Sequence, residues 1–445
     1  MKNKKIIILG TGVIANHCTE AIKEKNIVAV LDNLESKHGT EMFGCVIRPV
    51  SDVRKIDFDE AYICTLSCNA LREQLLELGI EDNKIKYYFD LKLNGLEKYG
   101  TSCKKTGKKL LLISHDFTVT GAQKSLLLMA KILVDNNYNV TVASPSDGDI
   151  RNKFVELGIE VIVDRRLEGG YLSDIEYVRD YETIVVNTVQ LYYLLRGFND
   201  IPVVWWIHEP KSFYNTVVKK ELDKLNLDNI ELYSVSSIAD KAFLETGCYL
   251  KPKRLTFGVE DSIHSKKNAD KFSFTTVGGI SKLKGHDLIL SAISLLPQEM
   301  RMNIEINFVG AFSKSVVGKV EITKDFNDVV DVYGFKDNDF TQQLIAESNV
   351  VIVASREETM SMVAVEAMIN STPVIVSDNA GVADHIEDGL SGLIFESENV
   401  KDLANKMMWV YENKEKTAEI GRAGRNVYER DFSYDAFGKN ILEIL

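Results

Sequence analysis

Short runs of apolar, often β-branched residues recur along the chain and alternate with longer stretches of good helix formers. A run that is apolar at consecutive positions is typical of a strand buried on both faces, as in a parallel sheet. The pattern therefore predicts an α/β protein built from strand–helix–strand units. The expected strands lie at 4–9, 27–31, 109–114, 140–143, 202–207, 272–277, 304–309, 330–333, 350–354 and 373–376.

The segment 349–377 shows this pattern most clearly. Its two strands enclose a stretch at 362–369 that contains good helix formers and neither glycine nor proline. In open α/β sheets, ligands bind beyond the carboxyl ends of the strands. The loop after the first of these strands contains Glu358, and we therefore expect a ligand there.

The helix that follows this loop offers a site for an anion. Its first N–H groups have no partner within the helix, so Ser361, Met362 and Val363 could bind a diphosphate. Glu366, separated from Glu358 by seven residues, would lie one to two turns along and accept hydrogen bonds from sugar hydroxyls. The same residues also fit a capped amphipathic helix that carries two solvated glutamates.

The N-terminal segment carries a second nucleotide-like pattern. The sequence G-T-G-V-I-A, which begins at Gly10, follows the first strand and opens a helix expected to reach about residue 24, and Asp32 ends the next strand. In the dinucleotide-binding arrangement, Gly10 permits the tight turn, Gly12 lets the backbone approach a pyrophosphate and Asp32 accepts from a ribose. No Tyr-x-x-x-Lys pair follows, so binding of NAD or another nucleotide stays open beside a structural or acceptor-positioning role.

Composition narrows the classes of protein further. The 445 residues carry a net charge of −12, which argues against nucleic acid as a partner because phosphate binding needs basic surface. No apolar run approaches transmembrane length and no signal peptide is recognisable, so we expect a cytoplasmic protein, with peripheral contact to the inner face of a membrane left open. The six cysteines show no paired zinc spacing, and we expect no metal site.

Four motifs resemble those of the retaining GT-B glycosyltransferases of the GT4-like group, also called glycosyltransferase group 1. The run E-x7-E from Glu358 to Glu366, followed by A-M, P-V-I, Gly381, D-G at 388–389 and Gly392, resembles the donor-site signature of that group. V-G-x-I-x-x-x-K-G-x-D at 277–287 resembles its phosphate loop, and S-H-x-x-x-x-x-G-A at 114–122 resembles the first loop of its acceptor domain. W-W-I-H-E at 205–209 resembles a motif whose histidine faces the donor sugar.

Four positions depart from the pattern of the group, and one of them is Thr120, which stands where the group often has the first of two glycines. Ser361 and Ser371 stand where glycine is usual, and Gly279 stands where many relatives have arginine. We expect Ser361 to cap the helix and Asn370 to take the left-handed conformation at its end. Lys282 or backbone N–H groups would replace the missing arginine.

The resemblance implies a role for each candidate residue. Glu358 and His208 would be catalytic residues at the donor sugar, Lys284 would contact the diphosphate and Glu366 would hold the ribose. The lysine and the helix N-terminus would neutralise the leaving diphosphate, so neither a metal nor a cofactor would be required. The other donor-binding residues would be Gly121, Gly278, Gly334, Phe335, Ser361, Met362 and Val363.

The resemblance also implies the domain organisation: a GT-B fold of two facing Rossmann-like domains, preceded by a small additional Rossmann-like domain. We expect the accessory domain at 1–92, an exposed linker at 93–108, the acceptor domain at 109–257 and the donor domain at 258–430. A C-terminal helix at 431–445 would cross back to the acceptor domain. The accessory domain resembles small modules attached to sugar-modifying and polysaccharide-synthesis proteins, not all of which bind a cofactor.

The implied function is retaining transfer of a sugar from a nucleotide-diphosphate sugar, most often UDP-linked in relatives. The acceptor would be a glycan, a lipid-linked molecule or a protein, in cell-surface polysaccharide or glycoconjugate synthesis, and the enzyme would be a metal-independent glycosyltransferase of the hexosyltransferase type. Two alternatives stay open. One is an NAD-linked sugar-modifying enzyme that uses the N-terminal domain, and the other is a non-catalytic partner of another transferase.

Overall fold

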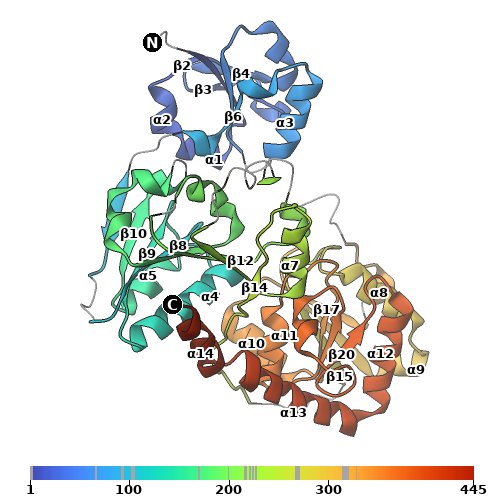
Figure 1. Cartoon of the computed structure of the whole chain (residues 1–445). Helices are drawn as coiled ribbons and strands as arrows, with labels where there is room; N and C mark the ends of the chain where they lie inside the picture. Colours follow the sequence, from blue (N-terminus) through green and yellow to red (C-terminus); the bar gives the residue numbers. More distant parts are fainter. Residues whose placement is uncertain are drawn as a thin grey trace. The chain divides into compact units, whose positions relative to one another are not determined.

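The computed structural model describes residues 4–65, 68–91, 95–101, 106–168, 171–198, 200–214, 218–219, 222, 225, 228–265, 271–312, 320–326 and 328–445. Within these residues the chain forms three sheets, each dominated by parallel strand pairs (Figure 1). The α/β class predicted from the apolar runs is confirmed, because nearly every run becomes a buried parallel strand.

The first sheet has six strands in the order β3-β4-β2-β1-β5-β6, and only the β3–β4 pair is antiparallel. Its strands are β1 (Lys5–Leu9), β2 (Asn26–Asp32), β3 (Glu41–Met42), β4 (Cys45–Pro49), β5 (Glu60–Ile63) and β6 (Ile85–Tyr87). Its helices are α1 (Val13–His17), α2 (Thr19–Lys23) and α3 (Cys68–Glu77).

The helix expected after the glycine-rich turn is divided. It consists of two five-residue helices, α1 and α2, that meet at Cys18. The Thr19 hydroxyl donates a hydrogen bond of 2.6 Å to the Asn16 carbonyl, an acceptor that a continuous helix would use for its own ladder. The glycine-rich motif predicted one helix here, and the bond from Thr19 accompanies the break at Cys18.

The second sheet has eight strands in the order β14-β13-β12-β11-β8-β9-β10-β7. Its strands are β7 (Leu96–Tyr99), β8 (Lys109–Ser114), β9 (Asn139–Ser144), β10 (Glu160–Asp164), β11 (Thr183–Asn187), β12 (Val203–Ile207), β13 (Ile230–Ser234) and β14 (Lys253–Arg254). Among the α-helices that accompany this sheet are α4 (Gly121–Asp135), α5 (Arg151–Glu156) and α7 (Ser237–Leu244).

Part of the segment 93–108, expected to be an exposed linker, is a strand. β7 pairs antiparallel with β10, with Leu96 opposite Asp164 and Tyr99 opposite Val161. Residues 93–94 and 102–105 of that segment lie outside the described residues. The four residues of β7 carry little apolar pattern of their own, so the unpaired edge of β10 decides their conformation.

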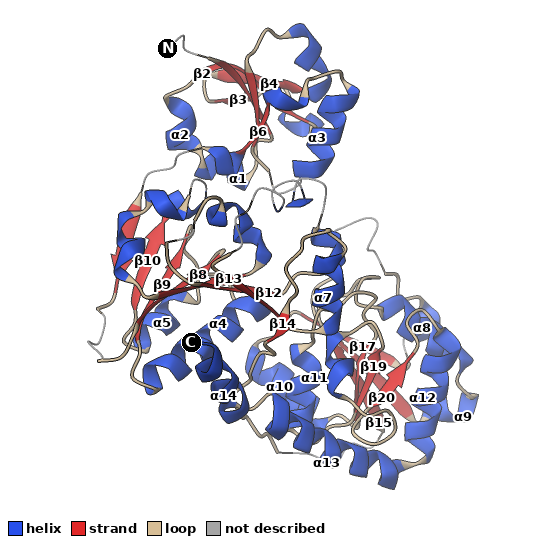
Figure 2. Ribbon diagram, in the orientation of Figure 1, coloured by secondary structure: helices blue, strands red, loops and turns tan. Residues whose placement is uncertain are grey.

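The third sheet is entirely parallel, with the order β17-β16-β15-β18-β19-β20. Helices α8 and α12 cover one of its faces, and α10 and α11 lie on the other (Figure 2). Its strands are β15 (Phe272–Val277), β16 (Ile304–Val309), β17 (Val330–Gly334), β18 (Val350–Val353), β19 (Val374–Ser377) and β20 (Leu393–Phe395). The helices of this part are α8 (His286–Leu295), α9 (Gln298–Met302), α10 (Asn338–Glu347), α11 (Met362–Ile369), α12 (Val400–Glu412), α13 (Lys414–Asp431) and α14 (Tyr434–Ile444).

The chain divides into two compact units. The first comprises Met1–Trp206, Ser212–Leu232 and Glu245–Leu250, and the second comprises the remaining segments, including Lys251–Leu445. The limits expected for the individual domains, and the return of 431–445 to the acceptor domain, stay predictions. Among the described residues, no helix combines the length and the apolar character needed to cross a membrane.

Within the first unit, the N-terminal sheet domain packs against the domain of the second sheet. Arg196 Nη1 lies 3.0 Å from Asp90 Oδ1 in an ion pair. The rings of Tyr88 and Tyr193, both buried, meet edge to face with their centroids 6.4 Å apart. Tyr88 directly follows β6, so the carboxyl end of this strand is covered by protein.

Candidate functional site

The carboxyl ends of β15, β16 and β17 are each marked by a glycine with a positive φ, a backbone conformation that side chains rarely adopt. Gly278, Gly310 and Gly334 have φ values of 138°, 148° and 66°. The Gly310 N–H donates to the Gly334 carbonyl at 2.8 Å, and a Cβ on Gly310 would lie 2.0 Å from the Gly278 carbonyl oxygen. Phe335, the next residue after Gly334, is 85% exposed. This edge therefore presents backbone and one free aromatic ring to a ligand.

The loop between β15 and α8 carries Lys284 to the end of β18. The turn at Gly285 has φ 73°, and a Cβ there would lie 1.9 Å from the carbonyl oxygen of Ala354. This close backbone approach brings Lys284 beside the loop after β18, where its ammonium forms an ion pair with Glu358 Oε2. The two residues that the sequence assigned to diphosphate and donor sugar are thus in direct contact.

The backbone of Glu358 is fixed by the segment that follows β19. Its N–H donates to the Asn379 carbonyl at 3.3 Å, and its carbonyl accepts from the N–H of Gly381 at 2.9 Å. On the side chain, the hydroxyl of Ser355 lies 3.5 Å from the carboxylate. Contacts on both backbone and side chain therefore hold this carboxylate at the carboxyl edge of the sheet.

The helix α11 begins directly after the Glu358 loop. As expected, Ser361 is its N-cap, and the Ser361 hydroxyl accepts from the Ala364 N–H at 3.3 Å. Glu366 is buried in the second turn of the helix. Met362 and Val363 are its first two residues, whose N–H groups face no earlier turn of the helix.

The end of α11 differs from the expectation. Asn370 has φ −88° and not the left-handed conformation, and its side chain donates to the Glu366 carbonyl at 3.0 Å. Ser371, which stands where the family usually has glycine, takes the left-handed conformation with φ 52°. Ser371 therefore takes the left-handed conformation that glycine would take at this position, and as a residue with a side chain it is strained there.

His286 supports the lysine loop from beneath. Its imidazole is buried, meets the ring of Phe308 at 4.8 Å between centroids, and lies 3.3 Å through Nδ1 from the Ser281 carbonyl. Burial lowers the pKa of His286 to about 4, so the ring is neutral at physiological pH. The neutral imidazole therefore supports the loop by packing and not by charge.

Two candidate residues belong to other segments of the chain. His208 follows β12, and its N–H donates to the Glu209 carboxylate at 2.9 Å. Gly121 is the first residue of α4, in the first compact unit. Their assignment to the donor site stays a prediction.

In the N-terminal domain, the carboxylate of Asp32 is already occupied by its own chain. It accepts from the N–H groups of Thr11 and Leu34, each at 2.8 Å, and Lys37 Nζ lies 3.7 Å away. Burial by itself would raise the pKa of Asp32. The hydrogen bonds from Thr11 and Leu34 and the charge of Lys37 outweigh burial, so the pKa is lower than its ordinary value. Gly10 has the left-handed conformation expected for the tight turn, with φ 89°. Nucleotide binding by Gly10, Gly12 and Asp32 stays a prediction.

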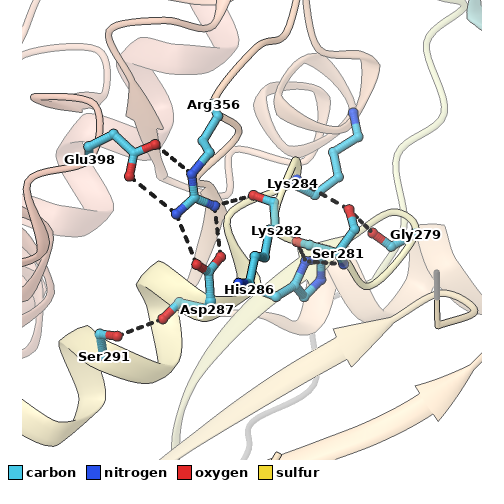
Figure 3. A network of polar contacts seen from close by, with 9 residues as sticks. All are labelled: Gly279, Ser281, Lys282, Lys284, His286, Asp287, Ser291, Arg356 and Glu398. Carbon is cyan, nitrogen blue, oxygen red and sulfur yellow. Dashed lines mark hydrogen bonds and ion pairs between the residues drawn. The ribbon is translucent and has the colours of Figure 1, made fainter. Parts of the chain in front are cut away.

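The sequence reasoning did not single out Arg356. This residue directly precedes the Glu357-Glu358 pair, and its guanidinium bonds to both Asp287 and Glu398 (Figure 3). The hydrogen bonds to Asp287, joined by those to Glu398, hold the pKa of Arg356 above its usual value against the effect of partial burial. Nothing in the local pattern announces these partners, because they lie 69 and 42 residues away.

The part of the chain described by the structure contains no group of three His, Cys, Asp or Glu side chains placed to hold a metal ion. The arrangement instead combines one ammonium, two carboxylates and a capped helix N-terminus at one edge of a parallel sheet. Such a set can bind a ligand that carries both negative charge and hydroxyl groups.

Three family models match the chain. They are described as Glycosyl transferases group 1, over residues 260–427, Glycosyl-transferase family 4, over residues 106–240, and C2185-like, N-terminal, over residues 2–86. Among solved structures, HepE from Anabaena in complex with UDP and glucose is 18% identical with a TM-score of 0.63, and the match covers 76% of this chain and 99% of that one. WaaG, a glycosyltransferase involved in lipopolysaccharide biosynthesis, is 15% identical with a TM-score of 0.55, and the match covers 75% of this chain and 99% of that one.

The fold and the strand-end site thus define a GT-B protein with an additional N-terminal sheet domain. The chain belongs to the group 1, family 4 glycosyltransferases, and its N-terminal domain is of the C2185-like type. An uncharacterized glycosyltransferase from Methanocaldococcus jannaschii is 29% identical over 161 residues, which is 36% of this chain and 43% of that protein. The chain spans less than half the length of the curated relatives that it matches first.

Proposed function

We propose that this protein is a retaining glycosyltransferase that moves a sugar from a nucleotide-diphosphate sugar, UDP-linked, to a glycan, lipid-linked or protein acceptor. The observation that carries the proposal is the contact between Lys284 and Glu358 beside the capped N-terminus of α11. A diphosphate needs positive charge and N–H donors, and a sugar needs acceptors for its hydroxyls, and this edge offers both.

In this proposal Lys284 and the first N–H groups of α11 bind the diphosphate and stabilise it as it leaves. Glu358 accepts a hydrogen bond from a hydroxyl of the donor sugar, and Glu366 accepts from the ribose. Phe335 and the glycine-lined backbone at Gly334 meet the base. His208 faces the donor sugar, and its imidazole or backbone carbonyl stabilises positive character at the anomeric carbon.

The leaving group is neutralised without a metal ion, because the lysine and the helix supply the positive charge. With no nucleophile assigned in the site, retention would follow from displacement on the same face of the sugar. The acceptor belongs to cell-surface polysaccharide or glycoconjugate synthesis, which the involvement of WaaG in lipopolysaccharide biosynthesis supports. The reaction takes place in the cytoplasm or at the inner face of the membrane. The N-terminal domain has a structural or acceptor-positioning role in place of nucleotide binding, since its Asp32 carboxylate is engaged within its own loop.

A panel of sugar nucleotides tests the proposal. Each donor is added to the full-length protein, and binding is measured by thermal shift and by calorimetric titration. A donor present at 100 times its Kd should stabilise the fold by about 2.7 kcal/mol. Slow release of UDP from the matching donor, lost in Lys284→Ala, would support the assignment, whereas stabilisation by NAD alone would favour the redox alternative.

A further inference from the structure

Arg356 joins the two loops that carry the candidate donor-site residues. It stands in the loop after β18, and its guanidinium reaches Asp287 in the first turn of α8 with two bonds of 2.7 and 2.9 Å. On its other side it reaches Glu398, before α12, with bonds of 2.5 and 3.2 Å. Glu398 has φ 64°, an uncommon conformation for this residue type.

The same arginine also holds the backbone of the lysine loop. Its guanidinium donates to the Lys282 carbonyl, and its own N–H donates to the Leu283 carbonyl at 2.9 Å. Together with Asp287, these contacts grip the loop on both sides of Lys284. The Lys284 side chain itself points away from the guanidinium (Figure 3).

Arginine suits this place better than lysine would. The planar guanidinium offers five donors in a fixed fork, and here it serves two carboxylates and one carbonyl at once. A lysine has three donors on a flexible stem and cannot keep both carboxylates and the carbonyl in place. The Arg356 side chain is 24% exposed, so the network is partly shielded from solvent.

We propose that Arg356 is a positioning residue that fixes the lysine loop so that the Lys284 ammonium stands beside Glu358 where the donor diphosphate arrives. The inference rests on the proposed function, because it names what prepares that same site. Arg356 acts through Lys284 and does not touch the donor. Because Arg356 holds the ammonium in place before the donor arrives, binding of the donor loses no free energy to ordering of the loop.

A matched arginine separates this role from a general loss of stability. Arg166 in the first compact unit also bonds in bidentate fashion to one carboxylate, Asp164, and pairs with a second, Glu176. Its side chain is 26% exposed, nearly the same as that of Arg356. Arg166→Lys therefore removes a similar network on a segment, directly after β10, that carries none of the residues assigned to the donor site.

The experiment is a double-mutant cycle on the affinity for UDP, measured by calorimetric titration with the full-length protein. Arg356→Lys should weaken UDP binding about tenfold, the loss expected when a charged contact is no longer held in place, while Arg166→Lys should change it by less than about twofold. In a Lys284→Met background, Arg356→Lys should cause no further loss, because the group through which it acts is absent.

The outcomes separate the inference from the function on which it rests. If the wild-type protein binds no sugar nucleotide or UDP, the proposed function and this inference both fall. If it binds UDP but the losses from Arg356→Lys and Lys284→Met simply add, Arg356 acts on the ligand or on the fold directly, and only the inference is overturned. Should Arg356→Lys not fold, Asp287→Asn breaks the same link from the other side and must give the same non-additive loss.

Discussion

The ion pair between Lys284 and Glu358 leads to a prediction in which one substitution moves two measurements in opposite directions. When a diphosphate binds, Lys284 must turn from Glu358 to the phosphate oxygens, and Glu358 is released for the hydroxyls of the sugar. Glu358→Gln removes the charge that holds the lysine. UDP alone should therefore bind the variant more tightly, while transfer from a UDP-sugar should fall.

The magnitudes follow from the exposure of the pair. The Lys284 and Glu358 side chains are 33% and 20% exposed, so their ion pair is partly solvated and contributes about 0.2–1 kcal/mol. Without this competing interaction, UDP affinity should rise by about 1.4- to 5-fold. The hydrogen bond from the sugar to a charged carboxylate is worth about 1.5–3 kcal/mol, so kcat/KM should drop by about 10- to 150-fold.

Calorimetric titration with UDP and a coupled assay of UDP release measure the two effects on the same protein. Glu357→Gln is the control, since it removes the same charge one residue away and tests whether any lost carboxylate raises the affinity for an anion. Unchanged or weaker UDP binding in Glu358→Gln, or an equal gain in Glu357→Gln, would refute the exchange of partners. Full transfer activity in Glu358→Gln would remove the residue from the donor site.

Three further predictions address the donor contacts, the metal and the buried carboxyl group. Lys284→Ala and Glu366→Ala should each weaken calorimetric binding of the UDP-sugar by about 1.5–3 kcal/mol, and unchanged affinity in both would take them out of the site. Transfer should survive a chelator such as EDTA, and a strict need for added Mn²⁺ would contradict neutralisation by Lys284 and the helix. Burial, aided by the Asp116 carboxylate, raises the pKa of Glu168 to about 7. The stabilising contribution of the Glu168 carboxyl group is therefore present below its ordinary pKa, 4.5, and is lost as the pH rises through 7. This loss lowers the free energy of unfolding by up to about 3 kcal/mol. In urea unfolding, Glu168→Gln should match the wild type at pH 4.5 and exceed its stability at pH 8, and equal curves at pH 8 would contradict the argument.

The apolar runs were enough to predict the parallel sheets because burial on both faces leaves its mark on every residue of a strand. The N-cap at Ser361 could also be predicted from the sequence, because its hydroxyl and the N–H group that donates to it lie only three residues apart. The family resemblance rested on the same kind of local signal, glycines and charged residues at fixed offsets within one loop. In each case the atoms that decide the structure are close together in the chain.

Other features became visible only in the folded chain. β7 is a strand because β10 offers it an edge, and Asp32 is engaged because Thr11 and Lys37 fold back onto it. The left-handed residue after α11 is Ser371 and not Asn370, since the asparagine side chain bonds back to Glu366. These outcomes depend on which of several possible bonding partners a residue meets in the folded chain. The propensity of a residue describes its own preference and not those partners.

The candidate site shows the same division. The sequence determined which charged residues follow the ends of the strands, and it placed Lys284 in the loop after β15 and Glu358 in the loop after β18. Only the tertiary structure brought them together across 74 residues and inserted Arg356 between Asp287 and Glu398. The reason is that β15 and β18 are neighbours in the sheet, and the close backbone approach at Gly285 then sets their loops in contact.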